Sequence, residues 1–145
     1  MPYNKEEVER IVNQFAGGMA ASVGRSGAVL ARIRGDGSDR SFAVERNNHE
    51  IPFLAKLSQS EQGFWGIPYA RSEELAQARE HLVLLTGHNR GYFIRKERVK
   101  FYLGKASRGH DGIKINEHIL RHVPYFSSTD SLWEMLSEAD GFSVA

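Results

Sequence analysis

Residues 39–58, DRSFAVERNNHEIPFLAKLS, decide the fold because they predict two strands joined by a tight turn. Apolar and polar side chains alternate on both sides of Asn47-Asn48, and a two-residue turn at these asparagines sets a single register. In that register Asp39 lies opposite Lys56. One face of the hairpin is then expected to join the core, and it collects Phe42, Val44, Ile51, Phe53, Ala55 and Leu57.

The other face of the hairpin is expected to face solvent, and it collects Asp39, Ser41, Ala43, Glu45, Glu50, Leu54 and Lys56. Opposite charges across a strand pair stabilise it by roughly 0.2–1 kcal/mol, so Lys56 beside Asp39 is a favourable pair. Glu45 lies opposite Glu50, where like charges destabilise the hairpin. A bound cation, nearby arginines, solvation near the turn or a longer loop would each relieve that repulsion.

Further elements are expected on both sides of this hairpin. Apolar residues at helical spacing predict a helix over residues 5–20, which Asn4 caps together with Glu7. Other helices are expected at 72–81, capped by Ser72, and at 128–140. Strands are expected at 28–35, 82–87, 91–96 and 112–116. Residues 63–69 are expected to form a strand or an extended loop, and residues 98–103 a helical turn or a strand.

The order of these elements predicts an α/β fold, with α+β as the alternative, in which helices flank a mixed central sheet. The 145 residues are enough for one core, and no repeat or linker divides the chain, so we expect a single domain over residues 1–145.

Composition excludes several classes of protein. Cysteine is absent, which excludes disulfides, thiolate metal sites and a cysteine nucleophile. The longest apolar runs are only a few residues, so no segment is expected to span a membrane, and the polar start of the chain has no apolar signal core. We therefore expect a cytoplasmic protein.

Net charge is only +1, but the basic residues are clustered. Between Thr86 and His110 there are seven basic residues and one acid, interleaved with aromatic residues. Such a segment suits phosphate contacts and base stacking, and a solvated face is the alternative. The expected nucleic-acid contacts are Arg90, Arg95, Lys96, Arg98, Lys100 and Lys105. A second cluster consists of Arg25, Arg32, Arg34, Arg40 and Arg46.

From Asp39 to Leu103 the chain resembles small nucleases of the PD-(D/E)xK superfamily, especially the resolvase-like and intron-encoded homing type. The residues that carry the likeness are Asp39 with RSFAV, then FLAKLS, GFWGI, SEELAQAREH, LVLLTG and GYFI. They follow the family's order of a strand opening with Asp, a hairpin, a strand ending near Lys, an aromatic strand, a helix and a strand pair. The resemblance implies a restriction-endonuclease-like fold and a magnesium-dependent endonuclease acting on DNA.

In this family two carboxylates hold a divalent metal, and a lysine assists the attacking water or the phosphate. The resemblance assigns Asp39, or alternatively Asp36, to the metal and Lys56 to catalysis. Leu54 stands two residues before Lys56, where the family has Glu, Asp or Gln.

A carboxylate from elsewhere in the chain would have to supply the missing oxygen, and Glu9, Glu45 and Glu50 are the candidates. The expected catalytic set is Asp39, Glu50 and Lys56. The expected Mg²⁺ ligands are Asp39, Glu45 and Glu50.

Other functions stay open. One is a non-catalytic module that binds a protein partner or forms a homodimer through an exposed sheet edge. Another is a small-molecule site lined by Trp65 and Tyr69. His118 and His122, four residues apart, suit a zinc site on a helix, or are structural histidines. Motifs for a phosphate loop or a serine nucleophile are absent from the sequence.

Overall fold

The computed structural model describes residues 2–36, 39–59 and 63–141, and for residues 33–36 and 39 it describes the backbone. The helices are α1 (Lys5–Gly24), α2 (Tyr69–Leu75), α3 (Lys96–Lys105), α4 (Thr129–Ala139) and the 3₁₀ turn η1 (Glu117–Leu120). The strands are β1 (Val29–Asp36), β2 (Asp39–Arg46), β3 (His49–Leu57), β4 (Phe64–Pro68), β5 (His81–Gly87), β6 (Arg90–Ile94), β7 (Ser107–Arg108), β8 (Gly112–Asn116) and β9 (Tyr125–Phe126).

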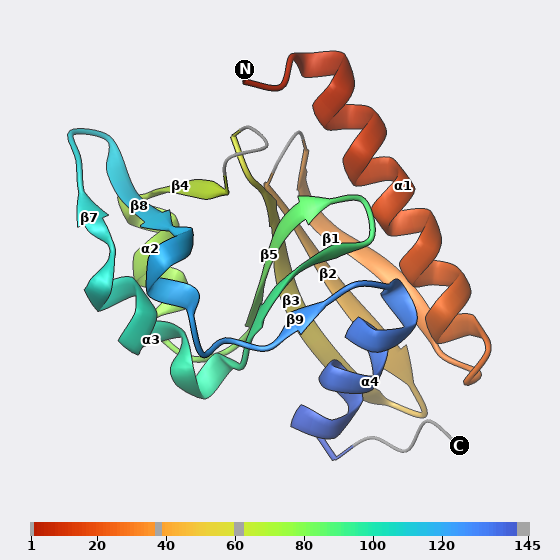
Figure 1. The fold of residues 1–145 in the computed structure, drawn as a ribbon. Helices are drawn as coiled ribbons and strands as arrows, with labels where there is room; N and C mark the ends of the chain where they lie inside the picture. The colour runs from red at the N-terminus through yellow and green to blue at the C-terminus, as the bar shows by residue number, and fades with distance from the viewer. Residues whose placement is uncertain (1, 37–38, 60–62, 142–145) are drawn as a thin grey trace.

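The strands form two sheets (Figure 1). The larger is a mixed sheet of six strands in the order β1-β2-β3-β5-β6-β9, in which β3 and β5 run parallel and the other described neighbours run antiparallel. The smaller is antiparallel, in the order β4-β8-β7. The expected mixed central sheet flanked by helices is therefore confirmed.

The central hairpin has the expected register. Asn47 and Asn48 have φ angles of 51° and 63°, the left-handed values that a two-residue type I′ turn requires and that asparagine tolerates. Asp39 lies opposite Lys56, and Glu45 lies opposite Glu50, as predicted. The alternation of side chains and the chemistry of the turn were together sufficient to fix this pairing.

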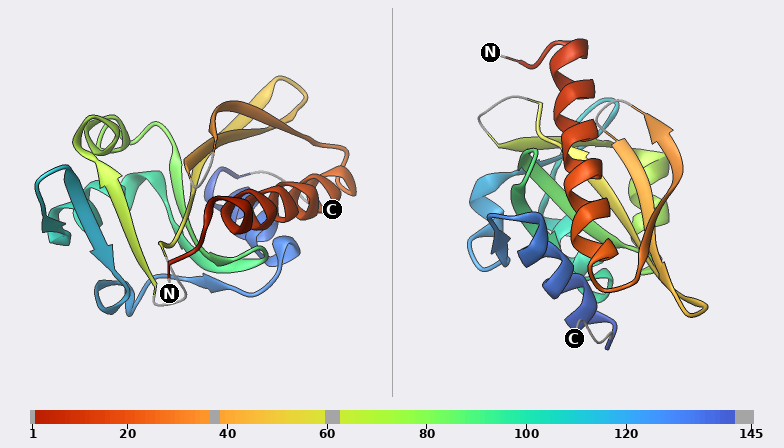
Figure 2. Two further views of the ribbon diagram at one scale, coloured as in Figure 1. Left: turned by 90° about the horizontal axis from the view of Figure 1, so that it is seen from above. Right: turned by 90° about the vertical axis from the view of Figure 1, so that its right-hand side faces the viewer.

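Each face of the large sheet is covered (Figure 2). On one face α1 and α4 pack over a core that includes Phe15, Met19, Phe42, Phe53, Phe126 and Trp133. On the other face lies a small lobe, defined here as β4, α2, α3, β7, β8 and η1. It packs over a second core that includes Leu54, Trp65, Ile67, Leu75, Leu82, Leu84, Val99 and Ile115.

The expectation that the second hairpin face meets solvent is therefore wrong at its Lys56 end. Leu54 is fully buried and Lys56 is only 8% exposed. The small lobe covers this end, whereas Glu45 and Glu50 beside the turn stay exposed. The polar residues on this face predicted contact with solvent, whereas the sheet is packed on both sides.

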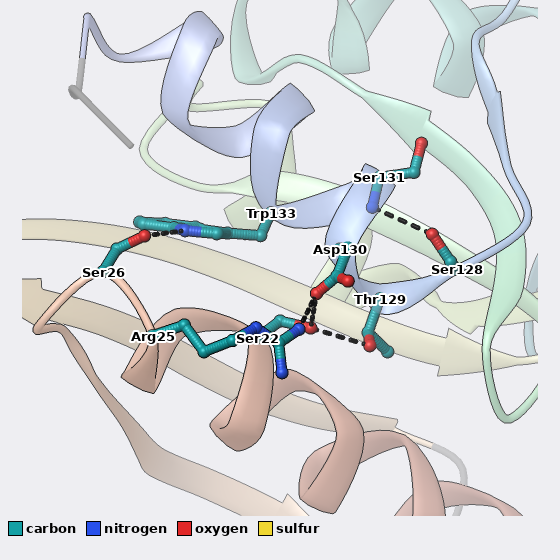
Figure 3. A network of polar contacts seen from close by, with 8 residues as sticks. All are labelled: Ser22, Arg25, Ser26, Ser128, Thr129, Asp130, Ser131 and Trp133. Carbon is teal, nitrogen blue, oxygen red and sulfur yellow. Dashed lines mark hydrogen bonds and ion pairs between the residues drawn. The ribbon is translucent and has the colours of Figure 1, made fainter. Parts of the chain in front are cut away.

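Helices α1 and α4 are joined by a polar network (Figure 3). Ser22 donates to Asp130 across 2.6 Å, and Arg25 forms an ion pair with the same carboxylate. The hydroxyl of Ser22 and the charge of Arg25 lower the pKa of Asp130. Close approach of the helices depends on Gly18, because a Cβ there would lie 3.0 Å from Cγ2 of Thr129.

Some local predictions need correction. The helix expected at 72–81 runs over Tyr69–Leu75 instead, and Ser72 does not cap it, because its hydroxyl donates to the carbonyl of Tyr69 inside the helix. Residues 98–103 belong to α3. The two-residue strands β7 and β9 were not predicted, because they are too short to show any periodicity.

Among the helices described, none has the length and apolar character needed to cross a membrane.

His81 joins α3 and α4 to the large sheet. Its side chain is fully buried, its Nε2 lies 2.9 Å from Oδ1 of Asp140, and its Nδ1 accepts a hydrogen bond from the backbone N–H of Lys96 at 2.8 Å. The neutral ring with its proton on Nε2 satisfies both contacts. Burial lowers the pKa of His81, and the hydrogen bond to Asp140 opposes that shift without cancelling it.

The stability of the protein is expected to fall as pH drops below about 6.5, the pKa of an unperturbed histidine. The unfolded chain then takes up a proton that folded His81 resists, and each such proton changes the free energy of unfolding by up to about 1.4 kcal/mol per pH unit. Urea unfolding at several pH values should show a shallower loss in His81→Asn than in wild type. His110→Asn is the control, since His110 is 98% exposed. Equal pH profiles for wild type and His81→Asn would contradict the prediction.

Candidate nucleic-acid interface

A cleft of about 540 Å³ lies where the end of β3 meets the small lobe. Lys56 and Gln59 line one side, and strand β4, strand β8 and the turn before β8 line the other. Gly66 leaves the wall open, because it has no side chain, and a Cβ there would contact only the amide of Gln59, at 3.3 Å. Lys114 lies opposite Gly66 in the β4–β8 register and also lines the cleft.

Two lysines, one histidine and one aspartate are the ionisable residues among the described residues that line this cleft. Lys56 and Lys114 contribute ammonium groups, and His110 an imidazole. The carboxylate of Asp111 is 99% exposed, so it is well hydrated at the rim. Cations lining a concave, partly desolvated wall suit an anion such as a phosphate group.

Of the predicted carboxylates, Glu9, Glu45 and Glu50 lie away from this cleft. Glu50 lies six residues from Lys56 along β3, a separation of about 20 Å in a strand, and Glu45 lies opposite Glu50. Glu9 forms an ion pair with Arg40, at 2.8 Å, on the face that α1 covers. The backbone of Asp39 lies opposite Lys56, but its side chain, like that of Asp36, is outside the part of the structure that is described.

Leu54 stands beside an apolar core and a hydrogen-bonded serine. Leu54 is fully buried and pairs with Ser41, whose hydroxyl accepts a hydrogen bond of 2.9 Å from Arg71. Arg71 also forms an ion pair with Glu80. Leucine thus stands at the position two residues before Lys56, where the resemblance calls for an oxygen ligand.

The described side chains that line the cleft do not supply a set of oxygen ligands for Mg²⁺. Mg²⁺ prefers several oxygen ligands, usually from one or two carboxylates together with water or phosphate. Within residues 2–36, 39–59 and 63–141, no three His, Asp or Glu side chains of known position lie close enough to hold a metal ion. His118 and His122 are exposed, and the 3₁₀ turn η1 covers only the first of them, which removes the helical spacing behind the zinc alternative.

The six predicted phosphate contacts separate into two groups. Arg98, Lys100 and Lys105 are exposed on α3. Arg90 starts β6, Arg95 lines a pocket with Glu138 near α4, and the ammonium of Lys96 lies 3.9 Å from Asp140. An acidic side chain therefore lies close to Lys96, and the exposed residues Arg98, Lys100 and Lys105 are the better candidates.

Several cations of the small lobe lie over aromatic rings. The guanidinium of Arg98 is 4.6 Å from the Phe101 ring centroid, and Nζ of Lys105 is 4.9 Å from the same centroid. Arg108 lies over Tyr69 at 4.9 Å, and Lys114 over Phe64 at 5.4 Å. We call Phe64, Tyr69, Arg98, Phe101, Tyr102, Lys105, Arg108 and Lys114 the basic–aromatic set.

Sequence reasoning left Arg108 and Lys114 out of the site. The signal for Lys114 was its place as the polar residue between Ile113 and Ile115, which puts it on the outer side of a strand. Three arginines of the second cluster have structural contacts, since Arg25 pairs with Asp130, Arg40 pairs with Glu9 of α1 and Arg46 donates to the carbonyl of Ser26.

The small-molecule alternative fails at Trp65. This side chain is fully buried, and its Nε1 donates to the carbonyl of Leu85 at 3.0 Å, so it cannot line an open site. Tyr69 is partly exposed and belongs to the basic–aromatic set.

Comparison of the chain with protein-family models, with curated proteins and with solved structures finds no match. The cleft and the basic–aromatic set are the features of this chain that bear on its function.

Proposed function

We propose that this chain is a DNA-processing protein with a nuclease-like fold, that it holds a phosphodiester backbone at the cleft beside Lys56, and that it does so without Mg²⁺-dependent cutting. The observation that carries the proposal is the lining of this cleft by Lys56 and Lys114. The exposed cations of α3 and β7, on the same lobe, extend the binding surface beyond it. Location in the cytoplasm is part of the proposal.

The order of elements supports the nuclease-like part of the proposal. A helix, α1, precedes the β1-β2-β3 meander, and α2 leads from the β4 strand into the β5–β6 pair. Asp39 opens β2 directly opposite Lys56 near the end of β3. This is the arrangement that the resemblance to PD-(D/E)xK nucleases implies for the metal-binding aspartate and the lysine.

The surroundings of Lys56 favour binding over cutting. Leu54 offers no oxygen ligand, and the hydroxyl of Ser41 opposite it accepts a hydrogen bond from Arg71. Glu45 and Glu50, the other expected ligands, lie at the far end of the hairpin. A lysine without a metal centre can still hold a phosphate by charge and hydrogen bonds.

A protein-binding module is the second candidate. Strand β1 forms one edge of the large sheet, and Val29 on it is 63% exposed. An edge strand can pair with a strand of another chain, including a second copy of this one. A homodimer that forms equally well with and without DNA would favour this function.

A cutting assay tests the proposal. Plasmid and branched DNA are incubated with Mg²⁺ or Mn²⁺ and with wild type or Lys56→Ala, and binding of the same DNA is measured in parallel. We expect binding by wild type, weaker binding by Lys56→Ala and no cutting by either. Cutting by wild type that Lys56→Ala abolishes would restore the endonuclease assignment, and absence of DNA binding at low salt would favour the protein-binding module.

A further inference from the structure

Phe101 is an exposed aromatic ring whose nearest neighbours are cations. It is 47% exposed on α3, whereas Val99 of the same helix is fully buried and anchors the helix to the core. Arg98 and Lys105 lie within 5 Å of the ring centroid, and the ring of Tyr102 meets it edge-on at 5.1 Å. The ring is therefore held at the surface among groups that attract phosphates.

The attraction between these cations and the ring is weaker than base stacking. A cation over an exposed ring changes an equilibrium by about 2–5-fold. Stacking of an unpaired base on an aromatic side chain changes binding by about 5–150-fold. A base can therefore take the place of a cation on Phe101, and the displaced cation, on its flexible side chain, can reach the neighbouring phosphate.

The cleft points to the same kind of ligand independently. Its volume of about 540 Å³ suits a ligand the size of one or two nucleotides rather than a duplex. Beside its two lysines it offers the amide of Gln59 and the carboxylate of Asp111, which can bond the edge of a base. The edge of a base is free for such contacts when the base is unpaired.

We infer that the nucleic acid recognised by this protein is single-stranded, with an unpaired base stacked on Phe101 and the strand continuing toward the cleft beside Lys56. The inference rests on the proposed function, since it names the substrate class of the same interface. The resemblance to nucleases implies that DNA is cut and does not specify whether the DNA is single-stranded, so the preference for a single strand goes beyond it.

Fluorescence anisotropy tests the inference with a labelled oligothymidylate and a mixed-sequence duplex of the same length at low salt. Wild type should bind the oligothymidylate about 10-fold or more tightly than the duplex, and Phe101→Ala should lose about 5–150-fold of that affinity. Phe101→Tyr should retain it, because the ring remains. Tyr125→Ala is the matched control, since Tyr125 is also 47% exposed but lies on β9 of the large sheet.

The outcomes separate this inference from the proposed function. Equal affinity for duplex and single strand together with an unchanged Phe101→Ala would overturn the inference and leave DNA binding standing. An affinity loss in Tyr125→Ala as large as in Phe101→Ala would also overturn it, because the effect would not depend on the ring of α3. Failure to bind either DNA would overturn both.

Discussion

The double variant Lys105→Gln/Lys114→Gln is expected to bind DNA about 25–60-fold more weakly than wild type at roughly 0.1 M salt. Each lysine that contacts a phosphate releases roughly 0.7–0.9 counterions, and so contributes about that many decades of affinity between roughly 1 M and 0.1 M salt. Both lysines lie over aromatic rings of the small lobe, and Lys114 lines the cleft as well. Anisotropy with one labelled oligonucleotide measures the change.

Lys5→Gln/Arg10→Gln is the matched control for this prediction. Both residues are exposed on α1, which covers the opposite face of the large sheet, and the variant loses the same net charge. Its affinity should stay within about twofold of wild type if the location of the charges matters more than their sum. A loss equal to that of the small-lobe variant would show that binding follows net charge alone.

Trp65→Ala is expected to lower the free energy of unfolding by about 3–5 kcal/mol, the usual cost of removing a buried tryptophan. The ring is fully buried in the core of the small lobe, and it packs edge-on against Tyr92 with a centroid distance of 6.0 Å. Its Nε1 also donates to the carbonyl of Leu85 on β5. One side chain of β4 thereby fixes the small sheet to the large one, and with it one wall of the cleft.

Urea unfolding followed by circular dichroism measures this loss. Trp65→Phe keeps most of the ring and loses the hydrogen bond, so it should cost less, about 1–2 kcal/mol. Trp133→Ala is the matched control, because Trp133 lies on α4 and is buried in the core on the opposite face of the large sheet. At a temperature where both alanine variants are folded, only Trp65→Ala should weaken DNA binding. A cost below about 1 kcal/mol for Trp65→Ala would contradict the packing described here.

Much of the fold could be predicted from sequence because its signals are local. The capping box at Asn4 and Glu7 forms as predicted, and so do the Asn47-Asn48 turn and the strand at residues 112–116. Each depends on side-chain spacing or on backbone chemistry within a few residues. The packing of the small lobe over Lys56 depends on contacts between distant segments, and nothing in the hairpin itself predicts it.

The candidate site was predictable only in part for the same reason. The register placed Lys56 opposite Asp39, but burial of Lys56 depends on β4 and β8, which follow later in the chain. The arginine that approaches the Leu54 position, Arg71, comes from α2, and its contact with Ser41 cannot be anticipated from spacing. Glu45 and Glu50 lie opposite each other as predicted, and because both are exposed beside the turn, solvation relieves their repulsion without a metal.

The dependence of DNA affinity on salt tests the central claim most directly, because it counts phosphate contacts. The logarithm of affinity for a single strand should fall with the logarithm of salt with a slope steeper than about −2, and Lys105→Gln/Lys114→Gln should make that slope shallower by about 1.4. A wild-type slope near zero, or an equal change of slope in Lys5→Gln/Arg10→Gln, would contradict the claim that the small lobe holds a phosphodiester backbone.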